Sequence, residues 1–136
     1  MPENTRLRIA IVDDTRAILQ PLTRHFSYFS AFRVLPYSEP LTFLREFSSL
    51  DLDVALIDTQ MPGINGIELC RSIRRSEARR FAIIGMSSSE DYREKWLEAG
   101  ADEFFEKYRD FRKFESCAER IREIANKYPR QIVHPI

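Results

Sequence analysis

The sequence has little of what marks secreted, membrane-spanning or nucleic-acid-binding proteins. Its 136 residues include only two cysteines, Cys70 and Cys117, whose spacing fits no metal motif, so we expect reduced, packed thiols. The polar segment 1–8 is unlike a secretory signal, and no apolar run approaches the roughly 18 residues of a membrane span. Basic and acidic residues cancel at 21 each, whereas nucleic-acid-binding domains usually have a basic excess. We therefore expect a cytoplasmic protein with no membrane partner and no direct nucleic-acid binding.

Several arginines nevertheless gather in one stretch of the chain. They are Arg71, Arg74, Arg75, Arg79 and Arg80. A local basic patch is one interpretation of this cluster. A solvated helix face followed by a loop is the simpler one, because charge runs usually face water, and it is the one we expect.

Short apolar runs and helical patterns alternate along the chain. The runs at 7–12, 32–37, 53–58, 81–86 and 103–106 predict strands, and apolar residues at helical spacing follow each of them, the last over 111–128. Pro36 indicates that the second strand lies near an edge. Pro21 falls inside the first helical pattern and predicts a kink, or a helix start later than Thr15. Five such pairs predict one α/β domain with a parallel sheet covered on both faces.

Reactive side chains follow four of these strands. Asp13 and Asp14 come after the first, Asp58 ends the third, Ser87 follows the fourth and Lys107 follows the fifth. The carboxyl ends of parallel strands meet at one edge of a sheet, where ligands bind, so we expect these side chains to lie together. The acids suit Mg²⁺, and the amine and hydroxyl suit phosphate oxygens. Asp58 can also act as a nucleophile that forms an acyl phosphate.

Each of these residues alone has a simpler explanation. Asp13 and Asp14 could cap a helix, and Asp58 could open a turn. Ser87 and Lys107 could be an ordinary strand-end hydroxyl and a solvated amine. Their joint position at strand ends favours a phosphoryl-transfer site. Two carboxylates about 4 Å apart repel by roughly 4 kcal/mol at an effective dielectric near 20, so we expect Mg²⁺ to stabilise the fold and Asp58→Asn to stabilise the metal-free protein.

The sequence resembles the receiver domains of bacterial two-component response regulators from about Leu7 to Tyr128. The matching motifs are Ile-Val-Asp-Asp at 11–14, Leu-Ile-Asp at 56–58 with Met-Pro-Gly-Ile-Asn-Gly at 61–66, Ile-Gly-Met-Ser-Ser at 84–88, and the segment 99–107. The resemblance implies a flavodoxin-like, doubly wound (βα)5 fold with strand order 2-1-3-4-5. It assigns residues 1–128 to the receiver and 129–136 to a tail with no output domain, and so implies the stand-alone type.

By the same resemblance, Asp58 accepts a phosphoryl group from a histidine kinase or a histidine phosphotransfer protein. Asp14 and Asp58 bind Mg²⁺ directly, Asp13 acts mainly through water, and the main-chain carbonyl of Gln60 completes the protein ligands. Lys107 pairs with a phosphoryl oxygen. Such a protein catalyses only its own phosphorylation and dephosphorylation and is otherwise not an enzyme.

The resemblance also implies a switch. Ser87 hydrogen-bonds a phosphoryl oxygen, and Phe104 turns inward behind it. The face formed by the fourth helix, fifth strand and fifth helix then changes for a downstream protein partner, and the protein is a monomer or a weak dimer through that face. Gln60 and Ser89, two residues beyond Asp58 and Ser87, tune how fast water removes the phosphoryl group.

Tyr108 departs from the family pattern, in which a proline with a cis bond usually follows the lysine. Because a cis bond without proline costs about 3 kcal/mol, we expect a trans Lys107–Tyr108 bond and a rearranged loop. Tyr108 leaves open a degenerate receiver that binds partners without phosphorylation. A third alternative resembles the haloacid-dehalogenase phosphatases, but that family has Asp-x-Asp after its first strand, where this chain has adjacent Asp13 and Asp14.

Overall fold

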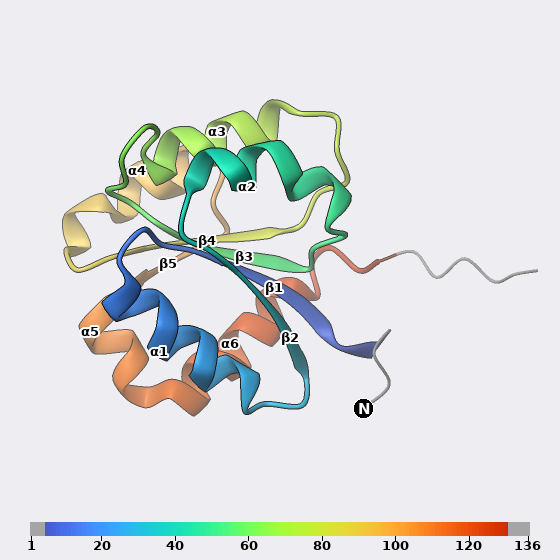
Figure 1. Ribbon diagram of the computed structural model, residues 1–136, viewed down its shortest axis with the longest axis vertical. Helices are drawn as coiled ribbons and strands as arrows, with labels where there is room; N and C mark the ends of the chain where they lie inside the picture. Colours follow the sequence, from blue (N-terminus) through green and yellow to red (C-terminus); the bar gives the residue numbers. More distant parts are fainter. Residues whose placement is uncertain (1–4, 131–136) are drawn as a thin grey trace, which may run out of the picture.

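A parallel sheet of five strands forms the centre of the protein, in a computed structural model that describes residues 5–130 (Figure 1). The order across the sheet is β2-β1-β3-β4-β5, which confirms the predicted flavodoxin-like fold. Of the expected tail at 129–136, residues 131–136 lie outside the described part, as do residues 1–4. The strands are β1 (Leu7–Val12), β2 (Phe32–Tyr37), β3 (Val54–Asp58), β4 (Ala82–Ser87) and β5 (Glu103–Glu106).

Helices cover both faces of this sheet. α1 begins at Arg16, directly after Thr15, so Pro21 lies inside the helix and does not mark its start. No helix among residues 5–130 is long and apolar enough to cross a membrane. α1 (Arg16–Ser27) and α6 (Phe114–Ala125) lie on one face, and α2 (Pro40–Glu46), α3 (Gly66–Arg75) and α4 (Arg93–Glu98) lie on the other (Figure 1).

The last helical segment is interrupted, so the expectation of a single fifth helix is wrong. It consists of α5 (Lys107–Asp110), a 3-10 turn (Phe111–Lys113) and α6. The early turn forms because the Glu106 carboxylate accepts hydrogen bonds from the amides of Tyr108 and Arg109, at 3.0 and 2.8 Å. Such a cap stabilises a helix start. Similar 3-10 turns follow α2 (Phe47–Ser49) and precede α4 (Glu90–Tyr92).

Two apolar cores, one on each face, join the helices to the sheet. β3 is buried along its whole length, so its alternate residues serve both cores. On the α1 and α6 face, the ring centroid of Phe26 lies 5.5 Å from that of Phe32 and 4.6 Å from that of Phe114. Cys70 and Cys117 are buried free thiols, as predicted. Each large apolar side chain buried in these cores stabilises the fold by about 1.5–3 kcal/mol.

Pro36 lies where its missing amide hydrogen costs the sheet nothing. The carbonyls of Ala31 and Tyr37 accept hydrogen bonds from the amides of Leu7 and Asp13. The main-chain N–H and C=O groups of the odd-numbered residues in this strand therefore point toward β1. Main-chain groups of alternate residues in a strand point to opposite sides, and Pro36 therefore points away from β1. The predicted edge position of β2 is confirmed.

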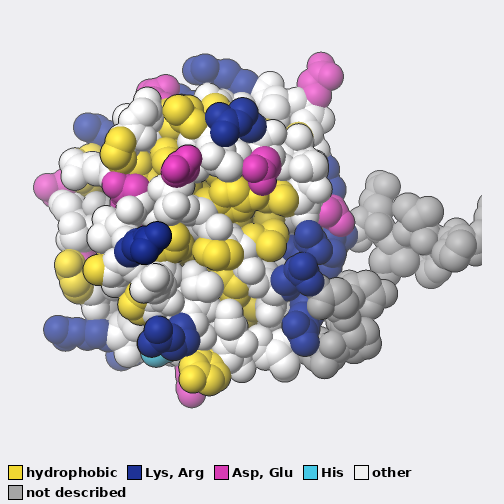
Figure 2. All heavy atoms as spheres, in the orientation of Figure 1, with side chains coloured by type: hydrophobic (Ala, Val, Ile, Leu, Met, Phe, Trp, Pro, Cys, Tyr) yellow, Lys and Arg dark blue, Asp and Glu magenta, His cyan; other side chains and the backbone are white. Residues whose placement is uncertain are grey.

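Hydrophobic side chains lie near the middle of the face seen in Figure 2, and Lys and Arg gather along its right side.

The arginine cluster is not a uniformly solvated face. Only 8% of the Arg74 side chain is exposed, and its guanidinium lies 2.9 Å from the Asp102 carboxylate. The same guanidinium donates to the carbonyls of Phe81 and Gly100, at 2.8 and 3.0 Å. The expected solvated position is therefore wrong for Arg74, because its side chain reaches from the end of α3 to the segments directly before β4 and β5. Arg79 also donates to main-chain carbonyls.

We expect Arg74→Met to lower the free energy of unfolding by about 3 kcal/mol, because it leaves the buried Asp102 carboxylate without its guanidinium. Arg75→Met is the matched control: Arg75 is the exposed neighbour in the same helix, and its loss should change stability by less than about 0.5 kcal/mol. Urea unfolding followed by circular dichroism measures both. Equal effects of the two substitutions would contradict a structural role for Arg74.

Candidate functional site

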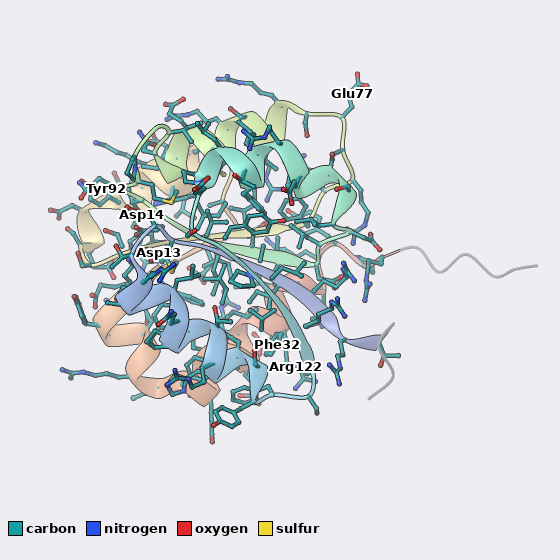
Figure 3. The ribbon with its side chains drawn as sticks, viewed as in Figure 1. Asp13, Asp14, Phe32, Glu77, Tyr92 and Arg122 are labelled. Atoms are coloured by element: carbon teal, nitrogen blue, oxygen red, sulfur yellow. The ribbon has the colours of Figure 1, made fainter. Side chains whose placement is uncertain are left out.

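Three carboxylates meet at the carboxyl edge of the sheet. Asp13 and Asp14 follow β1, and Asp58 ends the adjacent strand β3. One oxygen from each acid lies within 4.8 Å of the others. Asp13 is fully buried, Asp58 is 7% exposed and Asp14 is half-buried. Figure 3 shows Asp13 and Asp14 together at the turn between β1 and α1, on the side of the molecule where Tyr92 lies.

The ammonium group of Lys107 lies between two of these acids. Its Nζ is 2.9 Å from Asp58 Oδ1 and 3.0 Å from Asp13 Oδ2, with 12% of the side chain exposed. The described residues contain no cis peptide bond, which confirms the expected trans Lys107–Tyr108 bond. Directly after β5 the chain forms the α5 turn, in which the Tyr108 amide donates to Glu106. A proline at this position could not donate that hydrogen bond.

Burial and charge oppose each other in this cluster. Burial raises the pKa of the Asp58 carboxyl above its ordinary value; the hydrogen bond from Lys107 opposes this shift, and the charge of Asp13 adds to it. Burial alone would lower the pKa of Lys107, but its hydrogen bond to Asp58 and the charge of Asp13 outweigh burial and raise that pKa. Three carboxylates and one ammonium leave a formal charge of −2. The cluster therefore favours a further cation.

The donor set fits Mg²⁺, which prefers a few carboxylate oxygens together with water and phosphate. Both oxygens of Asp13 already have partners, because Oδ1 accepts from the Thr15 amide at 2.9 Å and Oδ2 from Lys107. Asp14 and Asp58 are therefore better placed as direct ligands, with Asp13 acting through water. Gln60, whose main-chain carbonyl is the expected further ligand, is an exposed residue two positions after Asp58.

The expected switch residues lie in different surroundings. Ser87 ends β4 at the acid edge, and its Oγ accepts a hydrogen bond from the Ser89 amide at 3.2 Å. Ser89 in turn caps the turn before α4 by accepting from the Asp91 amide at 3.2 Å. Phe104 is 1% exposed, and the Arg93 guanidinium lies 5.2 Å from its ring centroid. Ser87 is thus at the site, whereas Phe104 is inside the core and covered by Arg93.

Sequence reasoning missed the role of Thr59, which directly follows Asp58 and is buried. Its hydroxyl donates to the Met86 carbonyl and accepts from the Trp96 indole, both at 2.8 Å. A hydroxyl beside the acid is visible in the sequence. Its partner Trp96 lies on α4, and only the packed fold brings the two together.

Known proteins of the same architecture match this chain. The response regulator receiver domain profile covers residues 9–119. Response regulator MprA of Mycobacterium ulcerans is 31% identical over 103 residues, which are 74% of this chain and 44% of that protein. The response regulator domain of Thermotoga maritima CheB has a TM-score of 0.77 and 24% identity, covering 91% of this chain and 99% of that one. Response regulator protein TrrA of the same organism, solved in complex with Mg²⁺ and BeF, has a TM-score of 0.73 and 25% identity, covering 85% and 98%.

A flavodoxin-like sheet with acids and a lysine at its strand ends is the architecture of an α/β signalling domain. With the profile match over most of its length, the chain belongs to the response regulator receiver domain family. It spans less than half the length of the curated relatives it matches.

We expect Mg²⁺ to raise the midpoint of thermal unfolding, because it relieves the excess negative charge of the acids. Free Mg²⁺ at about 100 times its dissociation constant would add about 2.7 kcal/mol. Differential scanning fluorimetry with and without Mg²⁺ measures this. Asp14→Asn should abolish the rise, and Asp91→Asn, an exposed acid near α4, should leave it intact. A wild-type midpoint that Mg²⁺ does not move would exclude the metal site.

We expect Asp58→Asn to stabilise the metal-free protein by about 1 kcal/mol at neutral pH, because the raised pKa means that ionised Asp58 destabilises the fold. The gain should develop as pH rises above the ordinary carboxyl pKa of about 4, and it should be complete above the raised folded-state pKa of Asp58. It should vanish below about pH 4, where the carboxyl is protonated in both states. Urea unfolding in EDTA across this range measures the difference. A loss of stability at neutral pH would show instead that the Lys107 ion pair outweighs burial.

Proposed function

We propose that this protein is a phosphorylatable switch of a two-component phosphorelay, with Asp58 as its phosphoacceptor. The observation that carries the proposal is the Asp58 carboxylate held by Lys107 at the sheet edge, beside Asp13 and Asp14. Carboxylates are able nucleophiles that form acyl phosphates. Membership of the receiver family supports the same role.

In the proposed reaction an Asp58 oxygen attacks the phosphorus of a phosphohistidine on a histidine kinase or phosphotransfer protein. The new O–P bond forms as the N–P bond breaks, and the donor imidazole leaves with the bonding electron pair. Asp14, Asp58 and the main-chain carbonyl of Gln60 would hold Mg²⁺, with Asp13 acting through water. Bound Mg²⁺ supplies positive charge to the phosphoryl oxygens. The TrrA structure, solved with Mg²⁺ and BeF, supports this assignment for a relative of the same fold.

Lys107 would supply the second positive charge. Its ammonium already contacts Asp58 Oδ1, and a phosphoryl group on Asp58 adds negative charge at the same place. An ammonium has three donors, so Lys107 can turn to a phosphoryl oxygen and keep its hydrogen bond to Asp13. The raised pKa of Lys107 favours the charged form that this role needs. The contact with Asp58 also supports a working site over a degenerate one, which only Tyr108 favours.

The proposed output is a change in the face formed by α4, β5 and α6. Ser87 would hydrogen-bond a phosphoryl oxygen, and Phe104 would respond behind it. Arg93 covers Phe104 and pairs with Glu90 and Glu103, at 2.9 and 3.4 Å, so a shift of Phe104 would alter this charged surface. A downstream protein partner would read the change, and the protein would be a monomer or a weak dimer through this face.

Two further parts of the proposal concern lifetime and location. Gln60 and Ser89 would tune how fast water removes the phosphoryl group; Gln60 Nε2 donates to the Tyr92 hydroxyl at 2.8 Å, which fixes its side chain near α4. A cytoplasmic location is proposed because kinase donors act there and because both cysteines are free. The protein would catalyse only its own phosphorylation and dephosphorylation.

We expect incubation with acetyl phosphate and Mg²⁺ to add about 80 Da, the mass of one phosphoryl group. Asp58→Asn should abolish the adduct. Lys107→Met should lower its rate of formation by about tenfold or more, because it removes one of the two positive charges at the phosphoryl group. Intact-mass spectrometry at timed intervals measures all three proteins.

Asp102→Asn is the control. It changes a buried acid directly before β5, at the amino ends of the strands, and should leave the adduct unaffected. The absence of an adduct from acetyl phosphate and from every kinase tested would favour the phosphorylation-independent binding module. Fast multiple turnover of diverse phosphate esters would favour a phosphatase.

A further inference from the structure

Trp96 anchors α4 against the core beside the acid site. It is the only tryptophan in the chain, and it is fully buried. A Cβ at Gly85 would lie 2.1 Å from its ring, and a Cβ at Gly66 would lie 2.8 Å from it. Both contacts are too short for any residue but glycine. The ring is therefore closely packed between β4 and α4, and α4 cannot shift along the sheet unless the ring moves with it.

Thr59 joins this ring to Asp58. Its hydroxyl accepts from Trp96 Nε1 and donates to the Met86 carbonyl, both at 2.8 Å. Its carbonyl accepts from the Gly66 amide at 2.8 Å, and the peptide bond joins it directly to Asp58. The hydroxyl and the carbonyl of Thr59 are thus both engaged. Breaking one of these buried hydrogen bonds would cost the desolvation of the groups left unpaired.

The next residue makes a second connection to the same helix. Gln60 Nε2 donates to the hydroxyl of Tyr92, the residue directly before α4, at 2.8 Å. Two consecutive residues after Asp58 therefore each hydrogen-bond an aromatic side chain of the α4 segment. Tyr92 lies on the side of the molecule that carries Asp13 and Asp14 (Figure 3). A movement of the segment 58–60 acts on α4 at both points.

We propose that Trp96 is a positioning residue for Asp58, acting through Thr59, and that this hydrogen-bonded chain links the acid site to the position of α4. The link differs from the one through Ser87 and Phe104, because it leaves Asp58 through the next residue of the chain, Thr59. It rests on the proposed function in one respect, namely that phosphorylation of Asp58 is the event that uses it. By reciprocity, a partner that moves α4 changes the affinity of the acid site for Mg²⁺ by the same factor that Mg²⁺ changes the affinity for the partner.

The single indole allows a direct test, because nitrogen–proton correlation spectra contain one Trp96 indole resonance. We expect this resonance to shift when Asp58 changes, by Asp58→Asn or by Mg²⁺ with beryllium fluoride. In Thr59→Val, which removes the hydroxyl but keeps the shape, the shift should fall by about threefold. Thr59→Ser should restore it. Thr23→Val is the matched control, since the Thr23 hydroxyl donates to the Leu19 carbonyl within α1, far from α4.

The link would be overturned if Asp58→Asn shifted the Trp96 indole resonance as much in Thr59→Val as in the protein with Thr59. It would also be overturned if Asp58→Asn left the resonance unshifted when Thr59 is present. Trp96→Phe gives a second test that needs no indole: calorimetry should show Mg²⁺ binding weakened by about threefold, and unchanged affinity would contradict the positioning role. The Asp58→Asn comparison requires no phosphorylation. If neither acetyl phosphate nor any kinase tested leaves an adduct, the proposed function fails while the indole response still decides the link.

Discussion

The contact of the Lys107 ammonium with Asp13 and Asp58 is the interaction on which the site depends. Strand order alone brings three carboxylates to one edge, where their charges repel. The ammonium offsets part of this repulsion at 2.9 and 3.0 Å, and it reaches the acids because β5 ends beside β4 and α5 begins at Lys107. Glu106 holds that turn in place. The cap on this four-residue helix thus helps to set the electrostatics at the ends of β1 and β3, where the acids lie.

The strands and the acid edge could be predicted from the sequence because both follow from local pattern. A buried parallel strand is a short apolar run, and the residue after it lies at the carboxyl edge whatever the distant contacts are. Asp13, Asp14, Asp58 and Lys107 were found in this way. The break between α5 and α6 was not, since apolar spacing carries no sign of a carboxylate cap. The buried position of Arg74 and the Thr59–Trp96 hydrogen bond depend on partners distant in the chain, which composition and periodicity do not specify.

The two faces of the sheet differ in what their cores contain. The core under α1 and α6 holds an aromatic cluster of Phe26, Phe32 and Phe114. The core under α2, α3 and α4 contains Phe104 and Trp96, and the Trp96 indole hydrogen-bonds Thr59 directly after β3.

Pro36 has a consequence for assembly. An open sheet can grow by adding a strand from another molecule, and such growth is a common route to polymers. At the outer side of β2 the outward-facing position 36 offers a carbonyl but no amide hydrogen, so an added strand would find its ladder interrupted. Self-association along this edge is therefore disfavoured by the main chain itself, irrespective of the side chains around it. The sheet therefore keeps a fixed width of five strands at this edge.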